Sequence, residues 1–435
     1  MSKGLFDCIV QRTIDEVFDR LSKMQAAKRL FMVDGFSLLR MGAIGERART
    51  GQPVSEPYGT TRQFSGFDDL MFLPAQLARF PHEDYQTVST RTTIGKNARR
   101  PLELATPIMI TGMAYGAALS KRAKVCLAQA SSLVDTATNS GESGFLPEER
   151  QAARKYIVQW NRGRWGNDLA DMAKVDAIEI QVGQGAEGSL GTRVKAEDIR
   201  TDFRAHLGLA PGEDAVRPAR FRDITHPMQF KDLVDTLRQA SGGVPVGLKF
   251  AAGRIEEDLA VAIHAGVDFV TIDGAQGGTG GGREITINNT AIPLIYAIPR
   301  ARRILLERGV ADRIDLIATG GLRDAGDFAK ALALGADAVY IGESALLAMV
   351  YHQLDGLPVG TNPDQLFLYT GEYADRLDVK QGALAVAKFI RASTIELQLL
   401  AQTLGKDNVH SMEPDDMVAL SRHIAEITGV ALAYT

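Results

Sequence analysis

The chain has 435 residues, of which 45% are hydrophobic and 23% are charged, and its net charge is −4. This composition is ordinary for a globular protein, and the length allows two or three domains or one barrel-sized domain with extensions. The small net charge gives no indication of a nucleic-acid partner. Two cysteines, Cys8 and Cys126, are too few for a disulfide framework or for a metal or iron–sulfur centre held by cysteines.

Residues 1–100 are predicted to form an N-terminal extension that is partly helical. Residues 1–21 carry acidic side chains at helical spacing and lack the apolar core of a signal peptide. No stretch of the sequence is apolar for long enough to cross a bilayer. We therefore expect a cytoplasmic protein with no membrane association.

The principal domain is predicted in residues 101–350. Its first half contains three expected strands with their loops, in residues 106–116, 131–144 and 174–188. Helices are expected between them, in residues 117–130 and 146–160. Residues 192–226 are expected to be a long irregular insertion, and such insertions usually cover an active site.

Residues 244–350 contain four strand–loop–helix units in a row. The strands are short and apolar, which indicates parallel pairing, and they begin the segments 244–266, 267–309, 313–335 and 336–354. Glycine ends three of the four helices, as a left-handed cap often requires. Residues 351–435 are predicted to be a helical C-terminal extension, with apolar stripes in residues 381–405 and 413–429.

Two architectures contain such a repeat, a doubly wound open sheet and a closed (β/α)8 barrel. Gly320, Gly321 and Gly342 follow the last two strands of the repeat, where a barrel places its phosphate site. An open dinucleotide fold has its glycine fingerprint after the first strand instead. We therefore predict an α/β fold of the (β/α)8, or TIM-barrel, type.

The loops in residues 318–344 are the first candidate site. Gly320 and Gly321 allow backbone N–H groups to turn toward a ligand at the start of a helix, which favours an anion. Gly342 and Glu343 repeat this pattern one unit later. Together the two loops predict a cradle for a phosphate monoester, and the alternative is that these glycines only permit tight turns.

Lys249 lies among apolar residues in a predicted barrel strand. A buried ammonium group is costly unless it meets a negative group. We predict that Lys249 faces a flavin ring, whose anionic reduced form it would stabilise, and the alternative is a salt bridge inside the barrel.

Six of the ten residues from Asp273 to Gly282 are glycine. The spacing of Gly277, Gly278 and Gly280 does not match the dinucleotide fingerprint, and no helix follows at once. Glycine lets the backbone approach a flat ligand closely, and Thr279 keeps a hydrogen-bond donor among them. We predict a backbone wall beside a planar ring, although a lid hinge is an alternative and both roles can hold.

Polar residues lie at the ends of two other predicted strands. Asn139 and Glu142 suit recognition of an amino or imino group, or proton transfer, although such clusters are often plain turns. Gln181 and Gln184 need hydrogen-bond partners if they are buried, which a ligand would supply. Two lone histidines are interpreted as structural: His352, and His226, a weaker site candidate in the expected cover.

Eight segments resemble, in order, the FMN-binding synthase domain of the glutamate synthase family. They are FSGFDDLMFLPAQL, TPIMITGMAYGAALS, TNSGESG, EIQVGQGA, GLKF, IDGAQGGTGG, ATGGLRDAGDFAKALALGADAVYIGES and FIRASTIELQLLAQTLGKDNVHSM. The similarity covers roughly residues 60–420 and resembles most the stand-alone form that lacks an amidotransferase domain.

The resemblance implies a barrel that binds FMN, and an oxidoreductase acting on CH–NH2 donors. In the family, reduced FMN passes a hydride to 2-iminoglutarate, made from 2-oxoglutarate and ammonia. By carry-over, the expected catalytic residues are Lys249, Glu142 and Gln184, with Asn139, Glu142 and Gln184 near the 2-oxoglutarate site. The residues expected to bind FMN are Gly112, Met113, Ala114, Tyr115, Gly116, Asn139, Lys249, Gly277, Gly278, Thr279, Gly280, Gly320, Gly321, Gly342 and Glu343.

Two departures from the family pattern bear on function. The family usually has a cysteine cluster after the last barrel unit, and residues 346–369 contain no cysteine, so we expect no iron–sulfur cluster in this chain. Gln181 and Glu187 stand where the family commonly has lysines, which removes positive charge beside the substrate loop. A variant such as the FMN subunit of N-methylglutamate synthase, which uses methylamine-derived nitrogen, fits both changes.

The sequence shows no amidotransferase nucleophile and no nicotinamide fingerprint. Nitrogen and electrons are therefore expected from amidotransferase-like and electron-donating partner subunits, in an oligomer that acts on a small keto or imino acid. No metal site is expected. The alternative function is a flavin-binding scaffold subunit without turnover of its own.

Overall fold

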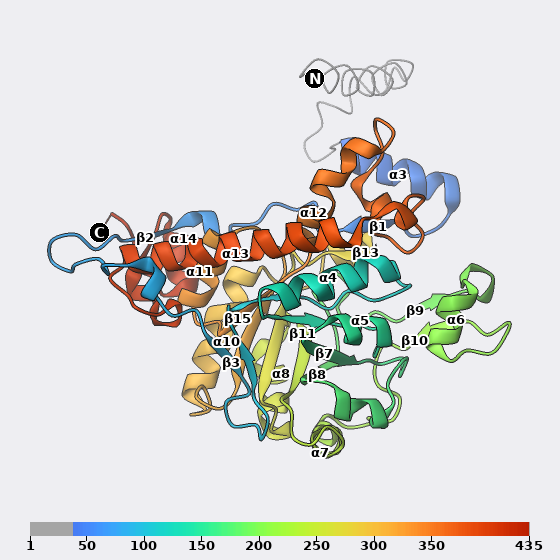
Figure 1. The fold of residues 1–435 in the computed structure, drawn as a ribbon, viewed down its shortest axis with the longest axis horizontal. Coiled ribbons are helices and arrows are strands. Elements are labelled where there is room, and N and C mark those ends of the chain that lie inside the picture. Colours follow the sequence, from blue (N-terminus) through green and yellow to red (C-terminus); the bar gives the residue numbers. More distant parts are fainter. Residues whose placement is uncertain (1–37, 435) are drawn as a thin grey trace.

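The structure, a computed structural model, describes residues 38–434 (Figure 1). Eight parallel strands form one sheet that curls into a barrel. In chain order, which is also their order around the barrel, they are β5 (Ile108–Ile110), β6 (Ala137–Asn139), β7 (Lys155–Trp160), β8 (Ala177–Gln181), β11 (Val246–Ala251), β12 (Phe269–Asp273), β14 (Asp315–Thr319) and β15 (Ala338–Ile341).

Pairing between β15 and β5 distinguishes the barrel from an open doubly wound sheet. Val339 on β15 is in register with Ile108 on β5, so the last strand of the repeat lies beside the first. The remaining gap is bridged where Thr136 Oγ1, just before β6, donates to the carbonyl of Ile108 at 2.7 Å. The predicted (β/α)8 barrel is confirmed.

A helical segment follows each barrel strand. These segments are α4 (Lys121–Leu133), α5 (Pro147–Ala152), the 3-10 helix η3 (Leu169–Lys174), α7 (Phe230–Ala240), α8 (Ile255–Ala265), α10 (Leu294–Glu307), α11 (Ala325–Ala333) and α12 (Glu343–Val350). The glycines that follow α8, α10 and α11 all have positive φ, as the sequence predicts: Gly266, Gly309 and Gly335.

Residues 146–160 differ from the prediction of one helix. The helix α5 ends at Ala152, and residues 155–160 form the buried strand β7. The short helix and the strand follow each other with only two residues between them, so their apolar positions merge into one apparent helical period. This strand supplies the eighth position of the barrel, which the sequence analysis left without a segment.

A hairpin closes the end of the barrel at which the strands begin. It consists of β3 (Thr92–Ile94) and β4 (Leu102–Leu104). Ile94, Leu102 and Leu104 pack with inward-facing apolar side chains such as Met109 and Phe269. Because side chains fill this half of the interior, the hairpin leaves no access for a ligand from this end of the barrel.

The segments before and after the barrel pack against each other and against its helices. The helix α3 (Leu38–Thr50) leads to β1 (Ser55–Tyr58), and β2 (Leu70–Phe72) pairs with β16 (Met417–Ala419). The helix α13 (Val379–Thr403) crosses α4, α11 and α12 (Figure 1). Its position confirms the helix predicted in residues 381–405. The helix predicted in residues 1–21 and Cys8 lie outside the described residues.

Residues 413–429 do not form the single helix that was predicted. They contain β16 and the short helix α14 (Arg422–Thr428). The strand forms because Met417, Val418 and Ala419 find a partner edge in β2, a contact distant in sequence that overrides the local helical pattern. Among the helices of residues 38–434, none combines the length and apolar character that a bilayer span requires.

The insertion after β8 is ordered, where the sequence suggested an irregular segment. Its strands β9 (Thr192–Val194) and β10 (Ala215–Arg217) pair antiparallel on either side of the helix α6 (Thr201–Leu207), and the unit projects from the barrel (Figure 1). Phe203 and Leu207 of α6 are buried with Tyr115 and Tyr369. The insertion therefore has a small apolar core shared with the barrel loops.

Candidate functional site

Glu179 is the centre of a buried polar network inside the barrel. Its Oε1 accepts from Asn139 Nδ2 (2.9 Å) and Gln159 Nε2 (2.8 Å), and its Oε2 accepts from Thr271 Oγ1 (2.7 Å). The four side chains are at most 1% exposed and come from four different strands. Sequence reasoning missed Glu179, although it is a charged residue inside an apolar strand, which is the same signal that identified Lys249.

Lys249 lies beside this network and pairs with Asp273 on the neighbouring strand. Lys249 Nζ is 3.1 Å from Asp273 Oδ2, and both side chains are buried. Burial by itself lowers the pKa of Lys249, but the charges of Asp273 and Glu179 outweigh burial and hold that pKa above its usual value. Lys249 therefore stays an ammonium ion at neutral pH, and the salt bridge named as the alternative is present.

Several buried polar atoms near the finishing ends of the strands have no hydrogen-bond partner among the described residues. They include both amide atoms of Gln181, Gln159 Oε1, Asp273 Oδ1 and Thr111 Oγ1. Each such atom costs about 1–3 kcal/mol in a folded protein. Gln181 is fully buried and directly in register with Lys249. These atoms form a donor and acceptor set that a bound polar ligand would satisfy.

Residues 112–116 lead from β5 toward the insertion. A Cβ at Gly112 would lie 2.6 Å from Gln159 Nε2 and 2.8 Å from Asn139 Oδ1, so only glycine fits beside the network. Met113 and Ala114 pass under Gly141, where a Cβ would meet their backbone. The side chain of Tyr115 is directed into the insertion, where its hydroxyl donates to Asp202 at 2.7 Å. Of the residues 112–116 that were predicted to bind FMN, the first three therefore lie beside the barrel network, and Tyr115 points into the insertion.

The glycine-rich stretch is partly a turn and partly a strand. Gly280 belongs to β13 (Thr279–Arg283), which pairs antiparallel with β1, a partner that the sequence did not indicate. A Cβ at Gly277 would collide with Asp273 Oδ1, and a Cβ at Gly274 would collide with Leu294. Close packing within the chain therefore accounts for part of this glycine content.

The two loops predicted to hold a phosphate are adjacent, but they are not equivalent. Ser344 Oγ donates to the carbonyl of Leu322 at 2.9 Å, which joins the loops. Asp324 caps α11 by accepting from the amides of Gly326 and Asp327, so this helix start is already occupied by a carboxylate. Helix α12 begins at Glu343 after Gly342 without a side-chain cap.

Gly320 and Gly321 have φ values of 110° and 75°, which only glycine adopts without strain. A Cβ at Gly320 would meet the backbone of Gly274, and one at Gly321 would meet the side chain of Gln276. Glu343 is exposed. The predicted phosphate cradle would therefore consist of the loop at Gly320 and Gly321 and the N-terminus of α12, which has no side-chain cap.

The insertion covers Glu142 and Glu187. Glu142 forms ion pairs with Arg217 and, at 3.5 Å, with Arg162, and Glu187 pairs with Arg217 and accepts from Thr279 Oγ1 at 3.1 Å. Gln184 lies at the same loop and is half-buried, with its backbone amide bonded to the carbonyl of Gly188. Neither arginine was identified from the sequence. His226 is exposed and caps a short 3-10 helix, as a structural histidine does.

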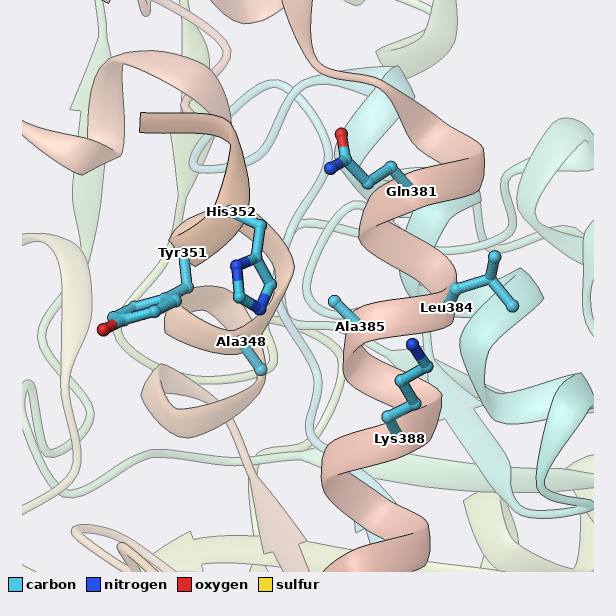
Figure 2. A pocket seen from close by; sticks show the side chains of 7 residues that line it. All are labelled: Ala348, Tyr351, His352, Gln381, Leu384, Ala385 and Lys388. Carbon is cyan, nitrogen blue, oxygen red and sulfur yellow. The ribbon is translucent and has the colours of Figure 1, made fainter. Parts of the chain in front are cut away.

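A hollow lies outside the barrel, between the end of α12 and α13 (Figure 2). Its volume is about 350 Å³. Tyr351 and His352 line one side, and Gln381, Leu384 and Lys388 of α13 line the other. The first side belongs to residues 346–369, where the family resemblance places a cysteine cluster. In residues 38–434, no group of three or more histidine, cysteine, aspartate or glutamate side chains is arranged to hold a metal ion.

Comparison with known proteins agrees with this architecture. A family model described as the conserved region in glutamate synthase matches residues 58–407. The chain belongs to the glutamate synthase family. A glutamate synthase large subunit-like protein of Rhizobium meliloti is 33% identical over 414 residues, which covers 91% of this chain and 93% of that protein. An archaeal-type glutamate synthase [NADPH] of a Thermotoga species is 30% identical over 392 residues, with 85% and 77% coverage.

Solved structures give the same fold at low sequence identity. An active chimera of (S)-mandelate dehydrogenase superposes with a TM-score of 0.53 and 14% identity, covering 81% of this chain and 88% of that one. A mandelate oxidase variant that carries an FMN adduct gives a TM-score of 0.50 and 17% identity, with 80% and 87% coverage. These likenesses establish the fold of this family member.

Proposed function

We propose that this chain binds FMN at the finishing ends of the barrel strands and is an FMN-dependent oxidoreductase of the glutamate synthase type. Its substrate would be an imino acid formed from 2-oxoglutarate and either ammonia or methylamine-derived nitrogen. The observation that carries the proposal is the buried amide of Gln181, whose donor and acceptor both lack a partner in the described chain.

The unpaired polar atoms fit a flavin ring. A flavin ring carries both donors and acceptors at its polar edge, and the amides of Gln181 and Gln159 offer both kinds of group. Gly112 leaves space beside Asn139 and Gln159, and Glu179 fixes the orientation of these two amides. When bound, FMN would supply the hydride for reduction of the imine. The chain's part is to orient the ring and to keep bulk water from it.

Lys249 places a positive charge beside these unpaired polar atoms. A cation near a flavin favours the anionic reduced ring, which makes reduction easier. The loop at Gly320 and Gly321 and the uncapped start of α12 would hold the phosphate, since backbone N–H groups and the helix dipole both attract an anion. The two loops are joined by the hydrogen bond from Ser344 to Leu322, so the phosphate of a single mononucleotide would reach both.

Partner subunits belong to the same proposal. The Rhizobium relative is named a large subunit-like protein, which supports a complex. We propose that amidotransferase-like and electron-donating subunits deliver nitrogen and electrons to this chain. Co-purification from the native host, followed by identification of the associated chains, tests this directly.

Substitution Q181L tests FMN binding. In the apoprotein, leucine removes two unpaired buried polar atoms, so we expect stability to rise or stay unchanged. FMN affinity should fall by about tenfold or more, the effect of losing about one hydrogen bond to the ligand. Q402L on α13 is the matched control and should leave FMN affinity unchanged. Wild-type protein that does not bind FMN, or Q181L protein that binds it equally well, would contradict the proposal.

The turnover part needs its own measurement. Photoreduced flavin on the purified protein should be reoxidised by an imino acid, generated from 2-oxoglutarate with ammonia or methylamine, faster than in buffer alone. Bound flavin that is never reoxidised by either mixture, with or without partner subunits, would favour the scaffold alternative.

A further inference from the structure

Arg217 fastens the insertion to two loops of the barrel. It is the last residue of β10 and is 6% exposed. Its Nη1 donates to Glu142, in the loop after β6, and its Nη2 donates to Glu187, in the loop after β8. One guanidinium group therefore forms ion pairs with two carboxylates, one at each terminal nitrogen, at the mouth of the barrel.

A second buried arginine lies under the same insertion. Arg162 follows β7 and is 2% exposed, and its Nη1 donates to the carbonyls of Ser189 and Ala219. It shares Glu142 with Arg217. The Nε atoms of both arginines are buried and have no partner in the described part of the chain. The two guanidinium groups thus retain unused donor capacity close to the loop that bears Glu187.

The charges in this cluster are balanced, with two arginines against two glutamates. The loop after β8 contributes an acidic side chain, Glu187, and the positive charge beside it comes from Arg217 of the insertion and from Arg162 after β7. Lys249 is already paired with Asp273. This cluster therefore offers cations to a substrate carboxylate, and arginine matches a carboxylate with two parallel hydrogen bonds.

Of the two carboxylates that pair with Arg217, Glu187 is more easily replaced by a substrate carboxylate than Glu142 is. Burial raises the pKa of Glu187, and the charge of Arg217 opposes that effect without cancelling it. Glu187 also holds the hydrogen bond from Thr279 Oγ1, so one of its oxygens stays bonded if it leaves Arg217.

We propose that Arg217 is the specificity-determining residue that binds a carboxylate of the substrate, and that Glu187 occupies its Nη2 until the substrate arrives. This inference rests on the proposed function. The insertion then closes the site and recognises the substrate with the same side chain. If the bridge served only to fasten the insertion, weakening it would never improve binding of a carboxylate.

Calorimetric titration of the FMN-loaded full chain with glutarate, a dicarboxylate that cannot be reduced, tests the inference. E187Q keeps the size of the side chain but gives up its charge, so Nη2 becomes available and glutarate should bind about tenfold more tightly. R217Q should weaken glutarate binding by about tenfold or more. D214N changes a half-buried carboxylate that pairs with Arg193 elsewhere in the insertion, and it should leave glutarate affinity unchanged.

Unchanged or weaker glutarate binding in E187Q overturns the role of Arg217. Because R217Q could also misfold, E187Q carries the decision, and circular dichroism and FMN affinity confirm that each variant is folded. Failure of every protein to bind FMN would count against the proposed function instead. In that case, glutarate titration of the apoprotein variants still tests Arg217 by itself.

Discussion

Lys249 and Asp273 lie on neighbouring barrel strands with Nζ 3.1 Å from Oδ2, and neither side chain is more than 9% exposed. The pair makes the role of Lys249 harder to test than a free lysine would be. A substitution at Lys249 removes a cation from the proposed flavin site and also leaves the buried carboxylate of Asp273 without a partner. The two effects have to be separated by design.

K249M should therefore lower stability as well as slow the reduction of bound flavin. Breaking a buried ion pair from one side costs about 3–5 kcal/mol, because the remaining charge is left without a partner. K249M/D273N removes both charges and should recover most of that stability, while flavin reduction stays slow. Urea unfolding and anaerobic stopped-flow reduction measure the two effects. Reduction at the wild-type rate in the double variant would exclude Lys249 from the chemistry.

Lys124 on α4 holds two loops of the candidate site through their backbone carbonyls. Its Nζ is 2.7 Å from the carbonyl of Met113, 2.9 Å from that of Asn139 and 2.9 Å from Glu149 Oε1. Burial lowers the pKa of Lys124, and Glu149 opposes this effect. A single buried ammonium thus joins the loops that follow β5 and β6.

We expect K124M/E149Q to weaken FMN binding about tenfold because the two loops lose their common anchor. The double variant avoids an unpaired buried charge, so its stability should exceed that of K124M alone. Lys121, on the same helix, pairs with Glu148 at the surface, and K121M should change stability by no more than about 1 kcal/mol. FMN titration and thermal unfolding measure these effects. Wild-type FMN affinity in the double variant would make Lys124 purely structural.

The barrel could be predicted because its signals are local. Apolar strands, helix-ending glycines and the two late glycine loops repeat along the chain, and each is read within a short window. The strand at residues 155–160 was not predicted because a short helix directly precedes it. The strand β16 was not predicted because it forms by pairing with β2, which is distant in sequence. Long-range pairing of this kind leaves little trace in local periodicity.

The site was only partly predictable for a related reason. Lys249 and Gln181 stand out as polar residues inside apolar strands, and Glu179 carries the same mark. Arg217 lies in a segment without periodicity, and its partners are 30 and 75 residues away, so nothing near it in sequence indicates a buried bridge. Likewise, the sequence does not show that Asp324 caps α11 while α12 has no side-chain cap, because capping depends on the rotamer of one side chain.

Gly116 is a test of how the insertion docks on the barrel. Its φ is 77°, and an added Cβ would collide with the ring of Phe203 on α6. Gly208 ends α6 with a φ of 70°, and a Cβ there would meet no atom within 4 Å. The two glycines share a positive φ, and the collision with Phe203 distinguishes G116A from G208A.

G208A should cost about 1–2 kcal/mol, the strain of alanine in the left-handed region. G116A should cost about 1–3 kcal/mol more, because Phe203 must move out of a packed cluster. We also expect faster proteolysis within residues 192–226 in G116A than in G208A. Equal stability and equal cleavage in the two variants would show that the insertion does not depend on this contact.

Asp315 gives the protein a predictable response to pH. It begins β14 at the closed end of the barrel, where Gly95 N donates to its Oδ2 at 2.6 Å and Lys96 lies 3.1 Å from Oδ1. Burial, together with the charge of Asp337, raises the pKa of Asp315 to about 6. The folded state therefore holds this proton more tightly than the unfolded state. Stability falls as pH rises from about 4 to about 6, and the loss is complete above pH 6.

D315N removes this titration but keeps an oxygen to accept from Gly95. The difference in unfolding free energy between D315N and wild type should shift in favour of D315N by up to about 3 kcal/mol between pH 4 and pH 7, the equivalent of about two pKa units. D235N changes an exposed carboxylate on α7 and should alter stability by no more than about 1 kcal/mol at any pH in this range. Urea unfolding at half-unit pH intervals measures the difference. A D315N curve that runs parallel to the wild-type curve would show that Asp315 ionises in the folded protein as it does in the unfolded chain.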